Sequence, residues 1–172
     1  MAKKLKISYK EAKETEPIIL LRLIKKMKKK IKEDPTAIKL FKDHDVDIDE
    51  LDLIPMTFKR LDVSAKCDHA VIYFNYKLLC EEDFDMMCGY MLHEVSHWVE
   101  QTSGSKPTQS SDDGEYLDNK SEQRAFTNQV SFIADNKGED HAEEYVDDLL
   151  EHHEIDNKKE KEEKKDILMD KV

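Results

Sequence analysis

The spacing of apolar residues predicts a chain made mostly of helices. In four segments apolar side chains recur every three or four residues, which is the period of an amphipathic helix. Proline stands at the start of the first segment, where the first helical turn accepts it, and Asp34-Pro35 marks its end, because the residue before a proline is pushed out of the helical region. The predicted helices span residues 17–33, 82–101, 120–136 and 139–155.

One segment has a different texture and predicts strands. Between Met56 and Asn75 the chain is rich in β-branched and aromatic residues, with a polar break at Lys66–His69. We expect two antiparallel strands, at residues 56–64 and 69–75. Together with the helices they predict an α+β fold, in which a small antiparallel sheet packs beside the helix at residues 82–101 and several helices surround it.

The length and composition predict one modest folded domain with charged flanking segments. The chain has 172 residues, of which 39% are charged and only 38% are hydrophobic, so much of the sequence belongs to surface and tails. We expect a basic helical arm and acidic linker at residues 1–50, a folded domain at 51–155 and a charged tail at 156–172. The tail is charged enough to be a frayed continuation of the preceding helix or disordered.

The net charge of -11 combines two unlike parts of the chain. Residues 1–32 hold twelve lysines and arginines against three acidic residues, whereas the remainder is strongly acidic. A negative field argues against a general nucleic-acid clamp, so nucleic acid could be contacted only through the basic helix at residues 17–33. That helix could also suit a membrane surface or an acidic partner, or simply dock as a solvated face on the acidic body.

The cysteines and the N-terminal segment bear on the location of the protein. Cys67, Cys80 and Cys88 form no paired pattern, which a reduced cytosolic protein tolerates, and we expect buried thiols. The first residues carry no apolar stretch of the kind a secretory signal has, and no segment approaches 18 uninterrupted apolar residues. We therefore expect a cytoplasmic protein without a membrane span.

The most informative segment is His93-Glu94-Val95-Ser96-His97, inside the helix predicted at residues 82–101. Residues four apart share a helix face, so both imidazoles can reach one metal ion, while Glu94 lies beside it and close to a metal-bound water. Neutral imidazole suits zinc, and a glutamate kept off the metal can take a proton from that water. The alternative is a pair of helix histidines that bind no metal.

A catalytic zinc normally takes a third protein ligand. The extended metzincin motif is excluded, because Glu100 and Ser103 stand where it requires glycine and histidine. We expect Glu122 to be the third ligand, since the loop before it lets the helix at residues 120–136 fold back and the small Ala125 allows close approach. Glu122 could instead only cap its helix together with Asn119, and other nearby acids could serve as the ligand, namely Glu115 and Asp118.

These motifs and their order resemble the HExxH zinc metallopeptidases of the gluzincin type, especially the small minimal-domain forms encoded by bacteria and their phages. The resemblance covers residues 56–135: two strands, a helix bearing HExxH, a variable loop and a helix carrying Glu-x-x-Ala. It implies a zincin-like fold, Zn²⁺ as cofactor and hydrolysis of a peptide or protein substrate through a zinc-bound water. His93, His97 and Glu122 would be the ligands and Glu94 the general base. A phage-encoded protein would act in the host cytoplasm or in the virion.

One departure from that family keeps a second class of function open. Phe126 stands where several gluzincins place an acidic residue that supports the metal site, so another group must orient the histidines. The alternative is a catalytically weak or inactive zincin-like module that binds a protein partner, such as a phage or mobile-element protein. By position, the candidates for stabilising an oxyanion are Tyr116, His141 and Tyr145.

Overall fold

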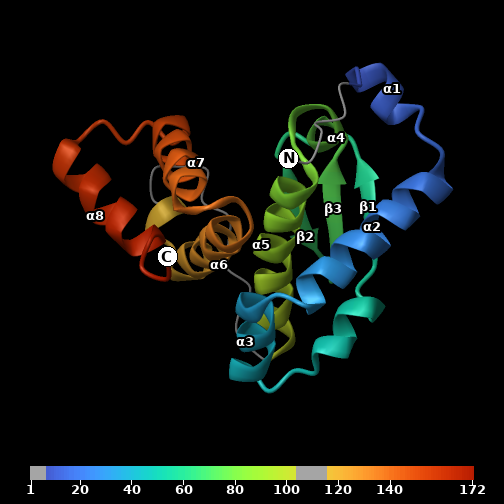
Figure 1. The fold of residues 1–172 in the computed structure, drawn as a ribbon, viewed down its shortest axis with the longest axis horizontal. Coiled ribbons are helices and arrows are strands. Elements are labelled where there is room, and N and C mark those ends of the chain that lie inside the picture. The colour runs from blue at the N-terminus through green and yellow to red at the C-terminus, as the bar shows by residue number, and fades with distance from the viewer. Residues whose placement is uncertain (1–6, 104–115) are drawn as a thin grey trace.

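The computed structural model describes residues 7–103 and 116–172 (Figure 1). The helices are α1 (Tyr9–Lys13), α2 (Pro17–Lys32), α3 (Pro35–Asp43), α4 (Lys77–Glu81), α5 (Phe84–Thr102), α6 (Lys120–Lys137), α7 (Glu139–His152) and α8 (Lys158–Leu168), with short 3₁₀ segments η1 (Ile48–Leu53) and η2 (Tyr116–Asp118). The strands are β1 (Met56–Lys59), β2 (Ala65–Asp68) and β3 (Val71–Asn75). Within the two described segments, no helix is both long enough and apolar enough to cross a lipid bilayer.

The predicted α+β class is confirmed, and so are the four predicted helices. The ends of α2, α5, α6 and α7 lie within three residues of the predicted ones. The sequence pattern did not reveal α3, because Asp34-Pro35 was interpreted only as the end of the preceding helix. In the structure Asp34 also caps the next helix: its carboxylate accepts a hydrogen bond from the Thr36 N–H at 2.9 Å, and Pro35 occupies the first turn.

The sheet differs from the prediction, because it is mixed and has three strands in the order β1-β3-β2. β2 pairs with β3 antiparallel, whereas β1 pairs with the other side of β3 in parallel, with Met56 opposite Ile72. The predicted polar break is itself most of β2, and a two-residue turn at His69 and Ala70 joins it to β3. Both turn residues have positive φ, 50° and 65°, as a hairpin turn of the tight primed type requires.

The charged C-terminal segment forms a separate helix instead of the predicted frayed or disordered tail. The Asn157 side chain begins α8 by accepting hydrogen bonds from the Lys159 and Glu160 N–H groups at 3.0 and 3.2 Å. Leu168, only 2% exposed, anchors the end of the helix in the same cluster as Val146. One buried leucine at the right position therefore outweighs a composition that is typical of disorder.

Helix α5 lies between two apolar clusters and is central to the fold (Figure 1). On one side its residues share a core with the sheet, α2 and α3, so the N-terminal helices and the sheet bury their apolar faces together. On the other side α6, α7 and α8 form the second cluster, which includes Phe126 and Ile133. A helix packed on both faces is held rigidly, which suits it to carry a functional site.

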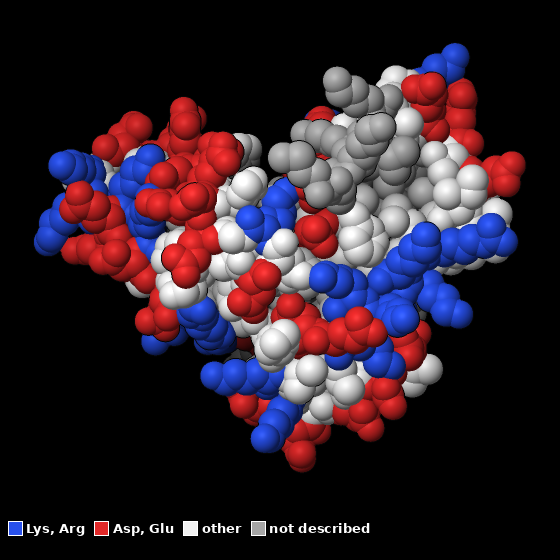
Figure 2. All heavy atoms as spheres, viewed as in Figure 1, with Lys and Arg blue, Asp and Glu red and all other residues white. Residues whose placement is uncertain are grey.

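Part of the basic face of α2 docks on the acidic segment η1. Buried Lys28 donates hydrogen bonds to the carbonyls of Ile54 and Asp52 at 2.7 and 3.2 Å, and burial lowers its pKa. Lys32 pairs with Asp49 and Asp52 at 2.7 and 2.8 Å. The remaining cations of α2 form the basic surface over this helix in Figure 2, whereas acidic side chains gather over α7.

Asp83 ties the start of α5 to the end of α6, and its replacement is expected to destabilise the fold. Its carboxylate accepts a hydrogen bond from the Met86 N–H at 3.0 Å and pairs with Lys137. Although burial opposes ionisation, these partners lower the pKa of Asp83. Asp83→Ala should reduce the free energy of unfolding in urea by about 1–2 kcal/mol at neutral pH.

The control for this prediction is Asp85→Ala, which removes an acidic residue from the same first turn but not the N-cap of α5. It should cost less, about 0.3–1 kcal/mol. Because the folded-state pKa of Asp83 is below its unfolded value, its contribution is present above the unfolded pKa and is lost as the pH falls through the folded pKa. Equal destabilisation by the two variants would contradict the assigned role of Asp83.

Candidate metal centre

The predicted ligands lie where α5 and α6 approach each other closely. At Gly89, α6 packs directly against α5: a Cβ atom there would lie 3.4 Å from the Gln129 Cγ and 3.5 Å from the Ile133 Cγ1 of α6, which is ordinary van der Waals contact. Ala125, fully buried, presents a small side chain at the same interface. His93 and His97 project from one face of α5 towards the first turn of α6, which carries Glu122.

The structure brings His93, His97 and Glu122 together into one buried triangle of donor atoms. The two Nε2 atoms are 3.2 Å apart, and Glu122 Oε2 lies 3.3 Å from each of them. Despite these short distances, no group in the described part of the chain forms a hydrogen bond of acceptable geometry with the buried Glu122 Oε2. The three atoms therefore face a common point, and among the described residues no other group of three or more such side chains could hold a metal ion.

The dimensions of the triangle fit a zinc ion. Ligand atoms at about 2.0–2.1 Å from a tetrahedral metal are separated by about 3.3–3.4 Å, close to the observed edges, whereas neighbouring ligands of an octahedral magnesium would be about 2.9 Å apart. Two imidazoles and one carboxylate are also the donor set of a catalytic zinc site, which leaves one position for water. The three residues thus fit the ion that the sequence motif predicts.

Glu122 meets the electrostatic requirements of a ligand. Burial opposes its ionisation, but the neighbouring imidazoles of His93 and His97 outweigh that effect and lower the pKa of Glu122 well below its usual range. The carboxylate is therefore ionised at neutral pH, as metal coordination requires. It does not form a capping pair with Asn119, whose own side chain caps α6 through the Ser121 N–H at 2.9 Å.

Glu94 lies beside the triangle without being part of it. It is 7% exposed, and burial together with the charge of Glu122 raises its pKa, against the opposing influence of His93, His97 and the Cys67 N–H. The Cys67 amide belongs to β2, so the sheet contributes to the surroundings of the Glu94 carboxylate. A buried carboxylate with a raised pKa, held off the metal ligands, is suited to accept and return a proton.

Of the three residues predicted to stabilise an oxyanion, only Tyr116 lies beside the triangle of donor atoms. Its ring packs at 78° against Phe126, with centroids 6.1 Å apart, and burial and the Glu122 carboxylate raise the pKa of its hydroxyl. Tyr145 packs instead against Tyr90, with ring centroids 6.4 Å apart, and His141 is exposed on α7. Of the alternative ligands, Asp118 pairs with Lys164 of α8, and Glu115 lies outside the described residues.

The surroundings of the two histidines are unequal. Phe126 packs against the His93 ring with centroids 4.3 Å apart, and the buried His93 Nδ1 has no hydrogen-bond partner among the described residues. His97 Nδ1, by contrast, lies 3.2 Å from the Ser121 hydroxyl. Phe126 stands at the position where an acidic residue could have accepted a hydrogen bond from His93. This agrees with the departure from the family that the sequence shows.

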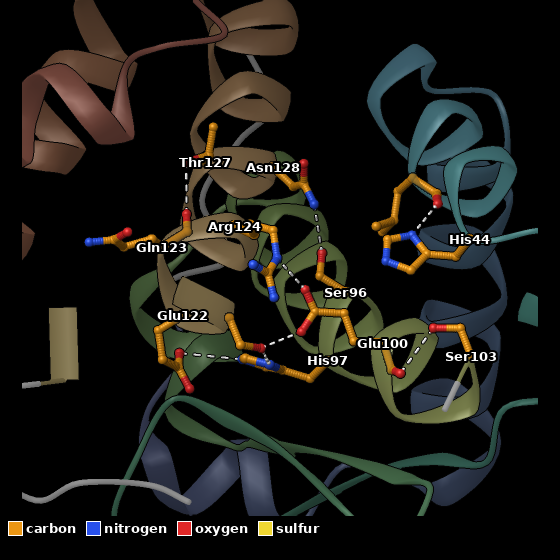
Figure 3. Close-up of polar contacts among 12 residues, drawn as sticks. His44, Ser96, His97, Glu100, Ser103, Glu122, Gln123, Arg124, Thr127 and Asn128 are labelled. Atoms are coloured by element: carbon orange, nitrogen blue, oxygen red, sulfur yellow. Dashed lines mark hydrogen bonds and ion pairs between the residues drawn. The ribbon is translucent and has the colours of Figure 1, made fainter. Parts of the chain in front are cut away.

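Sequence reasoning missed four residues around the centre. His153 stacks on Tyr116 with ring centroids 5.2 Å apart, and burial and His152 lower its pKa. The other three are Ser121, Glu100 and Arg124, which form a chain of polar contacts that begins at His97. His97, Glu100 and Arg124 are labelled in Figure 3. Glu100 follows His97 by three residues, a helical spacing that could have placed it near that ring. The contribution of His153 depends on the packing of α7, which no local pattern encodes.

Comparisons with known proteins provide no family for this chain. No family model matches it, and no curated protein or solved structure matches it either. The functional interpretation therefore rests on the geometry and chemistry of the site itself.

Proposed function

We propose that this protein is a zinc-dependent metallopeptidase with a zincin-like domain. The observation that carries the proposal is the buried triangle of His93 Nε2, His97 Nε2 and Glu122 Oε2, with edges of 3.2–3.3 Å, beside the separate carboxylate of Glu94. The first three residues would hold the ion. Bound zinc would act as a Lewis acid. It would lower the pKa of a bound water to near neutral pH and polarise a carbonyl group.

Glu94 is the general base of the proposed reaction. Its raised pKa brings it nearer to neutral pH, where it accepts a proton from the attacking water and then passes it to the nitrogen of the leaving amine. The Cys67 N–H favours the ionised carboxylate, which opposes the effect of burial on its pKa. Burial of Glu94 also keeps bulk water away from the proton during the transfer.

Tyr116 is the best placed of the oxyanion candidates. Its hydroxyl lies near the Glu122 carboxylate, and because its pKa is raised it stays protonated at neutral pH, as a hydrogen-bond donor must. In other enzymes, removal of one such donor raises the free energy of the transition state by about 3–4 kcal/mol.

A peptide substrate is supported by the position of β2, an edge strand packed beside α5. The Asn75 N–H bonds to the Ser64 carbonyl, so by the alternation of an antiparallel pair the backbone groups of Ala65 and the Cys67 carbonyl point to the edge away from β3, while the Cys67 N–H is directed at the Glu94 carboxylate. An extended peptide can add to such an edge through its own backbone.

The three cysteines are unpaired, which supports action in the cytoplasm.

Removal and return of the metal test the proposal. Zinc-loaded protein should cleave a mixture of unstructured peptides, lose that activity on treatment with a chelator and regain it when zinc is added, as measured by mass spectrometry of the products. Activity that persists through chelation would contradict a zinc-dependent mechanism.

A second candidate function is a zincin-like module that binds a partner without hydrolysis. One observation favours it: within residues 7–103 and 116–172 no acceptor bonds to the buried His93 Nδ1, and such a hydrogen bond usually raises the basicity of a zinc ligand. Protein that binds zinc but cleaves no peptide under any condition of the assay would support this function over the peptidase.

A further inference from the structure

A chain of polar side chains leads from His97 to the surface between α5 and α6 (Figure 3). His97 Nδ1 lies 3.2 Å from the Ser121 Oγ, which in turn donates a hydrogen bond to Glu100 Oε2. The other oxygen of that carboxylate, Oε1, accepts from Arg124 Nε at 2.6 Å. Ser121 and Glu100 are 5% and 6% exposed, so the chain is buried until it reaches the half-exposed guanidinium.

The direction of each hydrogen bond in this chain follows from the chemistry of its members. A guanidinium can only donate and an ionised carboxylate can only accept, so Arg124 and Ser121 both donate to Glu100. The single hydroxyl proton of Ser121 is thereby used, and its oxygen can only accept from His97. The proton of the His97 imidazole therefore lies on Nδ1, which leaves the lone pair of Nε2 facing His93 Nε2 and Glu122 Oε2.

We propose that Ser121, Glu100 and Arg124 are positioning residues that hold His97 in the tautomer and orientation needed to bind zinc. This inference rests on the proposed metal site. It answers the question raised by Phe126, because support for a histidine comes from a serine-linked carboxylate on α5 instead of an acid on α6. It also makes the site asymmetric: among the described residues the Nδ1 atom of His97 has a hydrogen-bond partner, whereas the His93 ring packs against Phe126 and its Nδ1 atom has none.

The first test is the zinc affinity of Ser121→Ala, measured by competition with a chromophoric chelator. Loss of the hydroxyl should raise the Kd for zinc about 10–100-fold, the usual effect of removing a group that orients a metal ligand. Ser121→Thr keeps a hydroxyl and should retain most of the affinity. The matched control is Ser131→Ala, which removes a buried α6 serine bonded to Thr36 at 3.0 Å and remote from the ligands; it should leave the Kd unchanged.

Glu100→Gln is the second test, because it reverses the direction of the chain without removing volume. A glutamine amide can donate to the Ser121 oxygen, and the hydroxyl proton then turns towards His97 Nδ1. The proton of the imidazole is driven to Nε2, where it competes with the metal. We expect the same 10–100-fold loss of zinc affinity as in Ser121→Ala.

A spectroscopic measurement separates positioning from a general effect on folding. In the zinc-loaded wild type the buried His97 Nδ1 proton should give a slowly exchanging NMR signal, which should disappear in Ser121→Ala. Unchanged Kd values in both Ser121→Ala and Glu100→Gln, with a wild type that binds zinc, would overturn the positioning role and leave the metal site intact. A folded wild type that binds no zinc would instead overturn the metal site, and the positioning role with it.

Discussion

Glu94→Gln is expected to slow peptide hydrolysis by about 10²–10⁴-fold, the usual contribution of a general base, while leaving zinc binding close to that of the wild type. Glutamine has nearly the shape of glutamate and can keep the contact with the Cys67 N–H, but it cannot accept a proton from water. Glu94 is not a member of the donor triangle, so the ion should still bind to His93, His97 and Glu122.

The measurement is the rate of cleavage of a defined peptide at saturating zinc, together with the zinc content of each preparation. The matched control is Glu151→Gln, which neutralises an exposed carboxylate on α7 and should leave the rate unchanged. A Glu94→Gln variant that keeps full activity would refute the assignment of the general base. A variant that loses both zinc and activity would show that Glu94 holds the metal instead.

Glu122→Ala is expected to weaken zinc binding by at least about a hundredfold. Structural zinc sites contribute about 10–16 kcal/mol from four ligands, so one ligand is worth about 3 kcal/mol, and each 1.4 kcal/mol is a factor of ten. Loss of Glu122 leaves two histidines of one helix, without the carboxylate that α6 brings to them. The effect should exceed that of Ser121→Ala, which leaves all three ligands in place.

The stability of the folded protein provides an independent measurement of the same effect. Zinc at about 100 times its Kd should stabilise the wild type by about 2.7 kcal/mol, and the same concentration should stabilise Glu122→Ala far less. Asp118→Ala is the matched control, since this acid lies near the start of α6 but pairs with Lys164. Equal stabilisation of wild type and Glu122→Ala by zinc would exclude Glu122 as a ligand.

Helices α2, α5, α6 and α7 were predictable because each buries a continuous apolar face, and the sequence records that face as a period of three to four residues. The sheet was only partly predictable, because all four residues of β2 are half-buried and show no alternation of burial. The turn at His69 and Ala70 contains neither glycine nor asparagine, so its positive φ angles had no signal in the sequence. The pairing of β1 with β3 depends on tertiary packing, which short patterns do not encode.

In the candidate site, too, the residues of one helix were predictable, whereas contacts between distant segments of the chain were not. The two histidines and Glu94 follow from a five-residue motif on one helix, and Glu122 follows from the requirement for a third ligand on a helix that folds back. Ser121 and Glu100 were not predictable as supports, because their contact spans 21 residues and exists only when α5 and α6 are packed. From the sequence alone, Glu100 indicates only that the extended metzincin motif is absent.

We expect His93, His97 and Glu122 to bind one zinc ion. Elemental analysis combined with X-ray absorption at the zinc edge tests this expectation most directly, on protein prepared without a histidine tag and loaded with zinc. We expect about one zinc per chain, with two imidazole nitrogens and oxygen ligands at about 2.0–2.1 Å. A folded protein that retains no zinc after loading, or a metal bound by sulfur at about 2.3 Å, would contradict it.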